Sequence, residues 1–227
     1  MESAFLFRII RMEEISMIEI TNLPVKHGNV PLRVARGHFA TNHSHINYYI
    51  DITYQKTRLS EAKDVAKQLV SIFKNNTPID TILCLDGTTV IGTCLADELT
   101  KSGFHSVNAH NTIYVVEPEY NSNSQMLFRD NIQPMIRNKH VLVLMASCTT
   151  GFTAGKSIEA IGYYGGELVG FAALYSAVDE IAGYPVRSVY NLSDLPDYAS
   201  YDYKDCPYCK AGRRLDALVN SHGYSWL

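Results

Sequence analysis

Val141-Leu-Val-Leu-Met-Ala-Ser-Cys-Thr-Thr-Gly-Phe-Thr153 is the stretch of this sequence that says most about the fold. Its first four residues form a continuous apolar run, which predicts a strand buried on both faces, and a helical pattern over 154–164 follows. Between the two, small hydroxyl residues surround Gly151, at the place where unpaired N–H groups and the positive end of a helix dipole favour an anion. We therefore predict a phosphate-monoester site at Thr149–Thr153. The alternative is an ordinary strand–helix turn, because such turns also favour Ser, Thr and Gly.

The sequence on either side continues the alternation of strands and helices. Apolar or β-branched runs predict strands at 48–53, 81–85, 112–116, 168–174 and 186–190, and helical spacing predicts helices at 60–73 and 90–99. This order predicts an α/β fold with a mainly parallel central sheet flanked by helices. We expect an N-terminal extension or hood over 1–34, the main domain over 35–192, and a C-terminal tail over 193–227 with a short helix near 213–220.

Composition excludes several classes of protein. The 227 residues are 46% hydrophobic and 19% charged, as in a globular domain, and the net charge of -3 argues against nucleic acid as a partner. There is no apolar run of the roughly 18 residues that a membrane span needs. The odd number of cysteines, five, is typical of a reduced compartment, so we expect a cytoplasmic protein. Residues 1–16 are expected to be a poorly ordered extension, with Met12 and Met17 as alternative starts.

Two other motifs compete with this interpretation. Thr150-Gly-Phe-Thr-Ala-Gly-Lys-Ser157 matches the end of a nucleotide-binding P-loop, but Thr150 stands where the first glycine belongs. Cys206-Pro-Tyr-Cys209 has the spacing of a redox dithiol. The same two cysteines could be half of a zinc site, with His222 or a neighbouring subunit supplying the other ligands. We favour an ordinary turn with two free cysteines, and we expect no zinc at Cys206 and Cys209.

Three segments in the right order resemble the orotate phosphoribosyltransferases, within the type I phosphoribosyltransferase family, over roughly residues 35–175. The segments are Gly37-His-Phe39 with Tyr48-Tyr-Ile-Asp51, the stretch from Asp80 through Asp86-Gly-Thr-Thr89 to Leu99, and the stretch from His140 to Thr153. The resemblance implies a substrate-binding segment, a pyrophosphate loop and a phosphoribosyl-pyrophosphate loop, respectively. It also implies a small-molecule phosphoribosyl or nucleotide ligand, Mg²⁺ as a cofactor, and a homodimer.

The residues that support chemistry in that family are largely replaced here. Two consecutive acids that would hold the ribose hydroxyls and organise Mg²⁺ correspond to Met145 and Ala146. Expected lysines fall at about Asn42 and Gly87, and the basic mobile loop falls near Glu117–Ser124, which has no Lys or Arg. Because hydrogen bonds to charged groups contribute about 1.5–3 kcal/mol each, loss of the acidic pair predicts ligand binding more than phosphoribosyl transfer.

The candidate site residues follow from these matches. The phosphate cradle would be Cys148, Thr149, Thr150, Gly151, Phe152 and Thr153; the pyrophosphate loop Asp86, Gly87, Thr88 and Thr89; and the base-binding segment Asn42, His43, His45 and Tyr48. Asp86, Glu117 and Glu119 are alternative cation ligands, although solvated loop carboxylates are the commoner case. We expect a protein that binds a phosphorylated ribose or a nucleotide; an active transferase with rebuilt metal and pyrophosphate contacts is the alternative.

Overall fold

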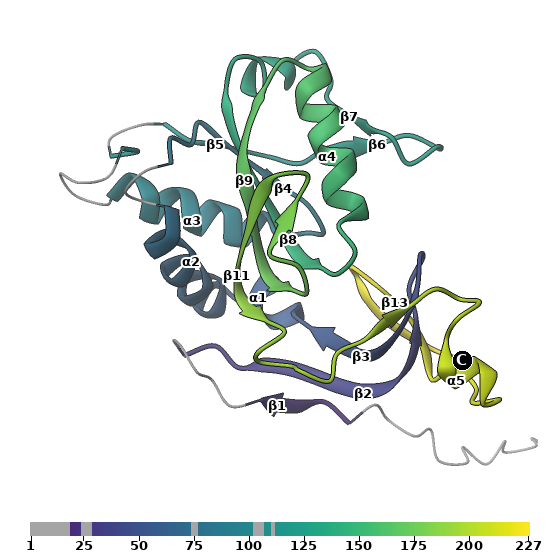
Figure 1. Ribbon diagram of the computed structural model, residues 1–227. Coiled ribbons are helices and arrows are strands. Elements are labelled where there is room, and N and C mark those ends of the chain that lie inside the picture. The colour runs from purple at the N-terminus through teal and green to yellow at the C-terminus, as the bar shows by residue number, and fades with distance from the viewer. Residues whose placement is uncertain (1–18, 24–28, 74–76, 102–106, 110–111) are drawn as a thin grey trace, which may run out of the picture.

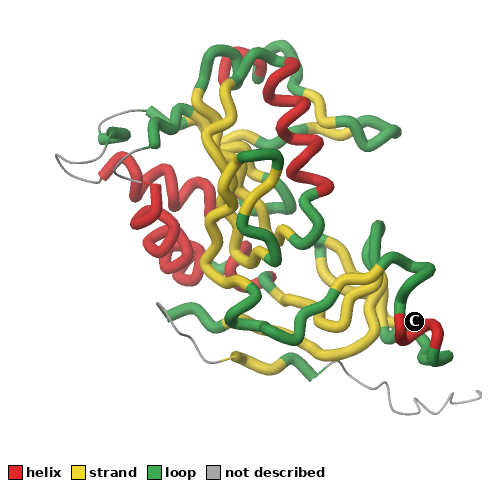
Figure 2. Tube along the Cα trace, viewed as in Figure 1, coloured by secondary structure: helices red, strands yellow, loops and turns green. Residues whose placement is uncertain are grey.

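The computed structural model describes residues 19–23, 29–73, 77–101, 107–109 and 112–227. The expected extension over 1–16 lies outside these residues. Two six-stranded sheets dominate the described part, and helices cover the two faces of one of them (Figures 1 and 2). The helices are α1 (Thr53–Thr57), α2 (Leu59–Phe73), α3 (Thr89–Lys101), α4 (Phe152–Tyr163) and α5 (Pro207–Lys210), with a 3₁₀ turn at Gln133–Met135.

The first sheet, which we call the central sheet, has the strand order β10-β11-β9-β8-β4-β5. Its strands are β4 (Thr81–Cys84), β5 (Tyr114–Val116), β8 (His140–Cys148), β9 (Glu167–Ser176), β10 (Glu180–Ile181) and β11 (Tyr184–Asn191). All neighbours are parallel except the β10–β11 hairpin. The predicted α/β fold with a mainly parallel sheet is confirmed.

Alternate residues of the central strands face opposite layers of helices, as strand geometry requires. Leu142 and Leu144 pack with α2 and α3, whereas Val141 and Val143 pack with α4. Figure 1 shows α2 and α3 on one side of the sheet and α4 on the other. Because both faces are covered, these strands are continuously apolar and nearly fully buried.

The second sheet, which we call the hood, is built from both ends of the described chain. It contains β1 (Thr21–Leu23), β2 (Leu32–Ala40), β3 (His45–Asp51), β12 (Ser200–Tyr201), β13 (Ala217–Asn220) and β14 (Gly223–Trp226), in the order β12-β3-β2-β13-β14 with β1 on β2. The expected domain boundaries therefore do not match the sheets: β2 crosses residues 34 and 35, and the tail contributes three hood strands.

Two local predictions were wrong. The helix expected near 213–220 is absent, and residues 217–220 form strand β13, whose residues alternate between buried and exposed; an apolar run as short as Ala217–Val219 does not separate strand from helix by its pattern. The turn expected at Cys206–Cys209 begins the one-turn helix α5, with Pro207 in its first turn. Within the polar stretch after β5, β6 (Glu119–Tyr120) and β7 (Met126–Leu127) form a small hairpin.

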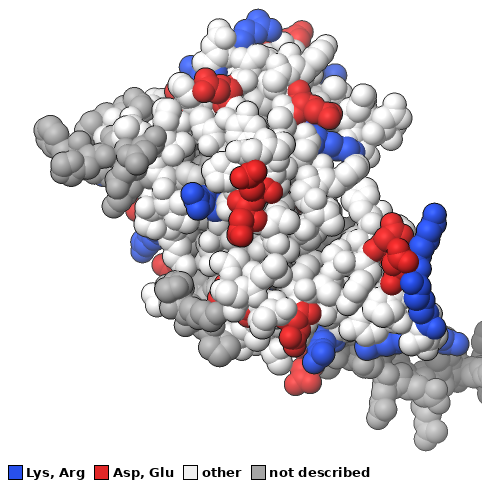
Figure 3. All heavy atoms as spheres, viewed as in Figure 1, with Lys and Arg blue, Asp and Glu red and all other residues white. Residues whose placement is uncertain are grey.

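The surface carries intermixed charges. On the face shown in Figure 3, basic and acidic side chains lie in small groups among uncharged residues. Among the described residues, no helix is both long enough and apolar enough to cross a membrane.

Candidate functional site: a cavity between the two sheets

A cavity of about 270 Å³ lies where the carboxyl end of β8 faces the hood. The loop Thr149–Thr153 forms one wall, and Met145 and Ala146 also line it. The opposite wall comes from the hood, through residues of the β2–β3 hairpin and Val219–Ser221 of the β13–β14 hairpin. Ligands of open α/β sheets bind at this edge, beyond the carboxyl ends of the strands.

The loop has the geometry of an anion cradle. Gly151 adopts a left-handed conformation with φ of 76°, which glycine enters without steric cost, and it directly precedes α4. No side chain caps the start of this helix. The first N–H groups of a helix have no partner within the helix, so those of α4 are free to bind an anion in the cavity. All six residues of the predicted cradle, Cys148–Thr153, line this cavity.

The second predicted loop lies beside the first. Asp86 and Gly87 line an adjoining cavity of about 470 Å³, which shares Phe152 and Thr153 with the first. Thr88 is fully buried and donates to the carbonyl oxygens of Leu85 (2.8 Å) and Leu144 (3.1 Å), so its side chain holds the loop. The Thr89 hydroxyl donates to Glu117. Of the four predicted residues of this loop, Asp86 and Gly87 therefore line the second cavity, whereas the hydroxyls of Thr88 and Thr89 bond to other protein groups.

Lys56 is a cavity residue that the sequence analysis missed. It lies on α1, lines the first cavity, and donates to the backbone carbonyls of Asp86 (3.1 Å) and Ser221. An ammonium has three N–H donors, so one remains for a ligand. Burial lowers the pKa of Lys56, and the carboxylates of Asp86 and Asp51 partly offset this. A search limited to the family's lysine positions, Asn42 and Gly87, could not find it; its place just after a predicted strand was the available signal.

Asp86 is the acid closest to this arrangement. Burial raises its pKa, whereas a hydrogen bond from the Ala146 backbone and the charge of Lys56 act in the opposite direction. Its φ of 57° is unusual for a residue with a side chain, so the loop holds Asp86 in a strained conformation at the edge of the cavity.

The other two predicted acids, Glu117 and Glu119, lie in different surroundings. Glu117 lines the second cavity, together with Lys156 of α4. Glu119 is exposed and forms an ion pair with Arg129, in which Nε lies 2.7 Å from the carboxylate, and this pairing lowers the pKa of Glu119. The described residues do not gather Asp86, Glu117 and Glu119 into one cation site.

The residues of the predicted base-binding segment also lie in two different places. Asn42, His43 and Tyr48 line the first cavity, and the rings of His43 and Phe152 contact each other with centroids 4.6 Å apart and planes inclined by 49°. This pair places two aromatic rings beside the loop Thr149–Thr153. His45 instead turns away into a cluster with His38, Cys206 and Cys209.

Comparison with solved structures places the fold. Orotate phosphoribosyltransferase from Aeropyrum pernix is 19% identical with a TM-score of 0.51, over 72% of this chain and 90% of the other. The Mycobacterium tuberculosis H37Rv enzyme, solved in complex with Fe(III) dicitrate, is 19% identical with a TM-score of 0.50, over 72% and 92%. Leishmania donovani UMP synthase is 19% identical with a TM-score of 0.51, and the match covers 72% of this chain but only 34% of that one.

Neither a protein-family model nor a curated protein sequence matches this chain. At 19% identity the structural matches establish the fold alone, which is that of the type I phosphoribosyltransferases. The predicted fold is confirmed.

Proposed function

We propose that this protein binds a phosphorylated ribose or a nucleoside monophosphate, with the phosphate held by Thr149–Thr153. The observation that carries the proposal is the left-handed Gly151 at an uncapped helix start inside a cavity. The loop offers backbone N–H groups and three threonine hydroxyls, and a phosphate monoester supplies the acceptor oxygens for both. Lys56 adds a cation to the same cavity.

The size and lining of the cavity suit the rest of such a ligand. The aromatic rings of His43 and Phe152 contact each other there, and Phe152 is half exposed, so its ring offers a face on which a base would stack. Tyr198 contributes a phenol to the wall, and because burial raises its pKa the hydroxyl stays protonated and can donate.

The apolar residues at the end of β8 favour ligand binding over phosphoribosyl transfer. Met145 and Ala146 line it with exposed fractions of 1% and 3%, at the positions where the resemblance implies a pair of acids. Apolar side chains cannot hold ribose hydroxyls or a metal ion. Of the three predicted acids, only Asp86 and Glu117 line the same cavity, and these two would be the ligands for Mg²⁺. Calorimetry with and without MgCl₂ tests whether the ion raises the affinity for phosphoribosyl pyrophosphate.

The direct test is calorimetry with ribose 5-phosphate, a panel of nucleoside monophosphates and inorganic phosphate. Replacing the Thr150 hydroxyl in Thr150→Val is expected to weaken binding about tenfold, since one hydrogen bond to a charged group is lost. Thr93→Val, a change on the exposed face of α3, is the matched control and should bind as the wild type does. No binding of any of these ligands, or equal affinities in Thr150→Val and wild type, would refute the proposal.

A pair of glycine variants tests the loop conformation. Gly151→Ala forces a side chain into the left-handed region and brings its Cβ to 3.3 Å from Ile181, so we expect at least about a tenfold loss of affinity. Gly155→Ala adds a Cβ in the interior of α4 with nothing within 4 Å; it should keep the affinity and stabilise the protein by roughly 0.5–1 kcal/mol. If the two variants bind alike, the loop is not the site.

Turnover separates binding from transfer. The wild type, incubated with phosphoribosyl pyrophosphate, Mg²⁺ and a panel of bases including orotate, is expected to form no nucleotide. Steady formation of a nucleotide that Thr150→Val abolishes would replace the binding proposal with a phosphoribosyltransferase. We also propose a homodimer, by resemblance, which light scattering tests.

A further inference from the structure

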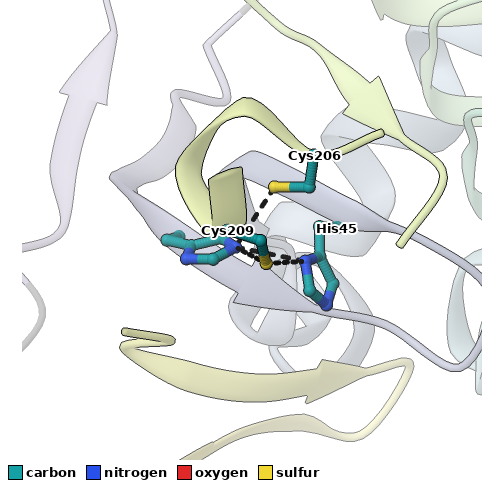
Figure 4. A group of neighbouring side chains, drawn as sticks. His45, Cys206 and Cys209 are labelled. Carbon is teal, nitrogen blue, oxygen red and sulfur yellow. Dashed lines mark hydrogen bonds between the residues drawn. The ribbon is translucent and has the colours of Figure 1, made fainter. Parts of the chain in front are cut away.

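Four metal-ligating side chains meet where the β2–β3 hairpin of the hood contacts the tail. They are His38 on β2, His45 on β3, and Cys206 and Cys209 at α5. Figure 4 labels the last three. Their ligand atoms, one from each residue, all lie within 4.8 Å of one another. Among the described residues this is the one group of three or more His, Cys, Asp or Glu side chains that could hold a metal ion.

Four of the six distances between the ligand atoms are close to the edges of a tetrahedron around one ion, and the other two lie within 4.8 Å. His38 Nε2 lies 3.1 Å from His45 Nδ1 and 3.3 Å from Cys206 Sγ. Cys209 Sγ lies 3.6 Å from His38 Nε2 and 3.2 Å from His45 Nδ1. With Zn–N bonds of about 2.0–2.1 Å and Zn–S bonds of about 2.3 Å, a tetrahedral zinc site has N···N edges of roughly 3.3 Å and N···S edges of roughly 3.5 Å.

Hydrogen bonds between these four side chains leave most of their lone pairs without a donor. His38 Nδ1 lies 3.1 Å from the backbone carbonyl oxygens of both Arg213 and Arg214. Carbonyl oxygens only accept, so Nδ1 carries the proton and Nε2 of the neutral ring presents its single lone pair to the cluster. That lone pair has three polar neighbours within 3.6 Å. A cation between them would use the lone pairs of all four groups at once.

The surroundings resemble those of protein-bound metals. A backbone carbonyl on the second ring nitrogen of a histidine ligand fixes its tautomer and orientation, as Arg213 and Arg214 do for His38. Aromatic rings also enclose the cluster: Tyr208 lies 5.2 Å from the ring of His38, and Tyr203 lies 5.0 Å from the ring of His45. His38 and Cys206 are fully buried, His45 is 8% exposed, and Cys209 faces solvent.

We propose that His38, His45, Cys206 and Cys209 bind one zinc ion. Four protein ligands fill a tetrahedral zinc ion, so the site is structural and leaves no position for a substrate. The set differs from the one that the sequence suggested, because His222 lies at the second cavity beside Asp86. The signal that could have found it is the pair of histidines seven residues apart, which the structure places on neighbouring strands of the β2–β3 hairpin.

The ion would fix the tail to the hood. Cys206 and Cys209 lie between β12 and β13, and β13 joins β2 directly beside His38: the Asp216 N–H donates to the His38 carbonyl (2.8 Å), and the His38 N–H donates to the Asp216 carboxylate (2.7 Å). The β13–β14 hairpin supplies Val219–Ser221 to the ligand cavity. Zinc would therefore hold one wall of that cavity in place, whatever the cavity binds.

Metal analysis of the full-length protein tests the proposal. After incubation with zinc and removal of the excess, we expect one zinc ion per chain by mass spectrometry. Replacement by Co²⁺ should give the intense visible bands of a tetrahedral site and a thiolate-to-metal charge-transfer band, which report the ligands without any substitution. A zinc content below about 0.1 per chain, or an octahedral cobalt spectrum without the charge-transfer band, would overturn the proposal.

Matched variants identify the ligands. Cys209→Ser changes an exposed position and should lower zinc affinity at least about 100-fold, whereas Cys94→Ser, a cysteine of α3, should leave it unchanged. Likewise His45→Gln should lose zinc and His222→Gln should keep it. Stoichiometric zinc in a Cys206→Ser, Cys209→Ser double variant, or loss of zinc in His222→Gln, would show that the ion is bound elsewhere.

Discussion

The central sheet and the hood are built from differently connected chain. The central sheet uses one continuous stretch, residues 81–191, and three of its pairings join strands that are close in sequence: β4 with β5, β8 with β9, and β9 with β11. The hood joins strands from residues 21–51 to strands from 200–226. Its closure therefore depends on contacts between residues more than 140 positions apart, such as the pairing of Ser200 with Ile46.

This difference shows in what holds each region together. The central sheet is stabilised by burial: apolar residues of β4, β8 and β9 pack between two layers of helices. The hood has a smaller core and several polar connections to the tail. These include the Asn47 amide on the 197–199 backbone, the Asp216–His38 pair, and the proposed zinc ligands. Closing a long loop lowers the entropy of the chain, so specific connections matter more there.

Truncation of the central core is expected to have the largest effect. Phe171 on β9 is fully buried in the layer beneath α4, so Phe171→Ala should lower the free energy of unfolding by about 3–5 kcal/mol. The matched control is Phe152→Ala, since Phe152 is half exposed and its removal should change stability by less than about 1 kcal/mol. Urea denaturation measures both. Equal losses in the two variants would show that burial does not govern this region.

The second prediction concerns the residue that connects the two regions. Lys56 donates to Asp86 at the central sheet and to Ser221 in the hood, and its third N–H is free for a ligand. Lys56→Met is expected to weaken the binding of ribose 5-phosphate by about 10- to 100-fold, the value of a hydrogen bond from a charged donor. Lys67→Met, on the solvent side of α2, is the control and should bind normally. Calorimetry measures the affinity of both variants, and equal affinities in Lys56→Met and Lys67→Met would contradict the prediction.

The same lysine predicts a pH dependence. Burial lowers the pKa of Lys56, so its proton is lost from the free protein at a lower pH than from an exposed lysine. Affinity for the phosphate should therefore fall as the pH rises from neutral toward about 10.4, because the neutral amine no longer attracts the anion. Lys56→Met should lack this fall. An identical pH profile in the variant would assign the effect to another group.

The contrast between the regions also explains what the sequence could predict. Continuous apolar runs and helical spacing identified β4, β8, β9, α2 and α3, because those patterns arise from local contacts with neighbouring layers. The loop Thr149–Thr153 was singled out for the same reason, since its proposed function depends on the helix that follows it. Met145 and Ala146, at the positions where the resemblance implies the acidic pair, line the same cavity.

What the sequence could not predict depends on distant pairing. Residues 217–220 form a hairpin with β14, and Ala217 and Leu218 also pair with Phe39 and Ala40 of the distant β2, a contact that nothing within those four residues reports. His38 and His45 become neighbours of Cys206 and Cys209 only after the tail folds onto the hood. Lys56 reaches the cavity because two backbone carbonyls from distant segments accept its hydrogen bonds.

A hood connection gives the fourth prediction. The side-chain amide of Asn47 donates to the Asp197 carbonyl (2.6 Å) and accepts from the Ala199 N–H (2.7 Å). Asn47→Ala leaves both groups without that partner at a nearly buried position, so a loss on the order of 1–2 kcal/mol is expected. Asn191→Ala removes only an exposed turn contact to Ser193 and should change stability by less than about 0.5 kcal/mol. Denaturation of both variants at pH 7 tests this.

The smallest effect should come from a charged contact in the central sheet. The Asp80 carboxylate accepts from both the backbone N–H and Nδ1 of His140, each at 2.8 Å. Burial acts to raise the pKa of Asp80, but the hydrogen bonds and charge of His140 outweigh it, so the pKa is lowered on balance. A carboxylate with a lowered pKa stabilises the fold above its unfolded value of about 3.9, and this contribution is lost as the pH falls through its folded value.

Asp80→Asn should therefore lower the free energy of unfolding at pH 7 by less than about 1 kcal/mol, since solvent screens a partly exposed pair. The difference from wild type should shrink as the pH falls below about 3.9, where the wild-type carboxylate also becomes neutral. The Asn47→Ala deficit should persist at the same pH, because neither the amide nor its backbone partners titrate. Denaturation of both variants at pH 7 and at a pH below about 3.9 checks this. If the loss of stability in Asn47→Ala also shrinks in acid, charged groups contribute to the contact between the hood and the tail.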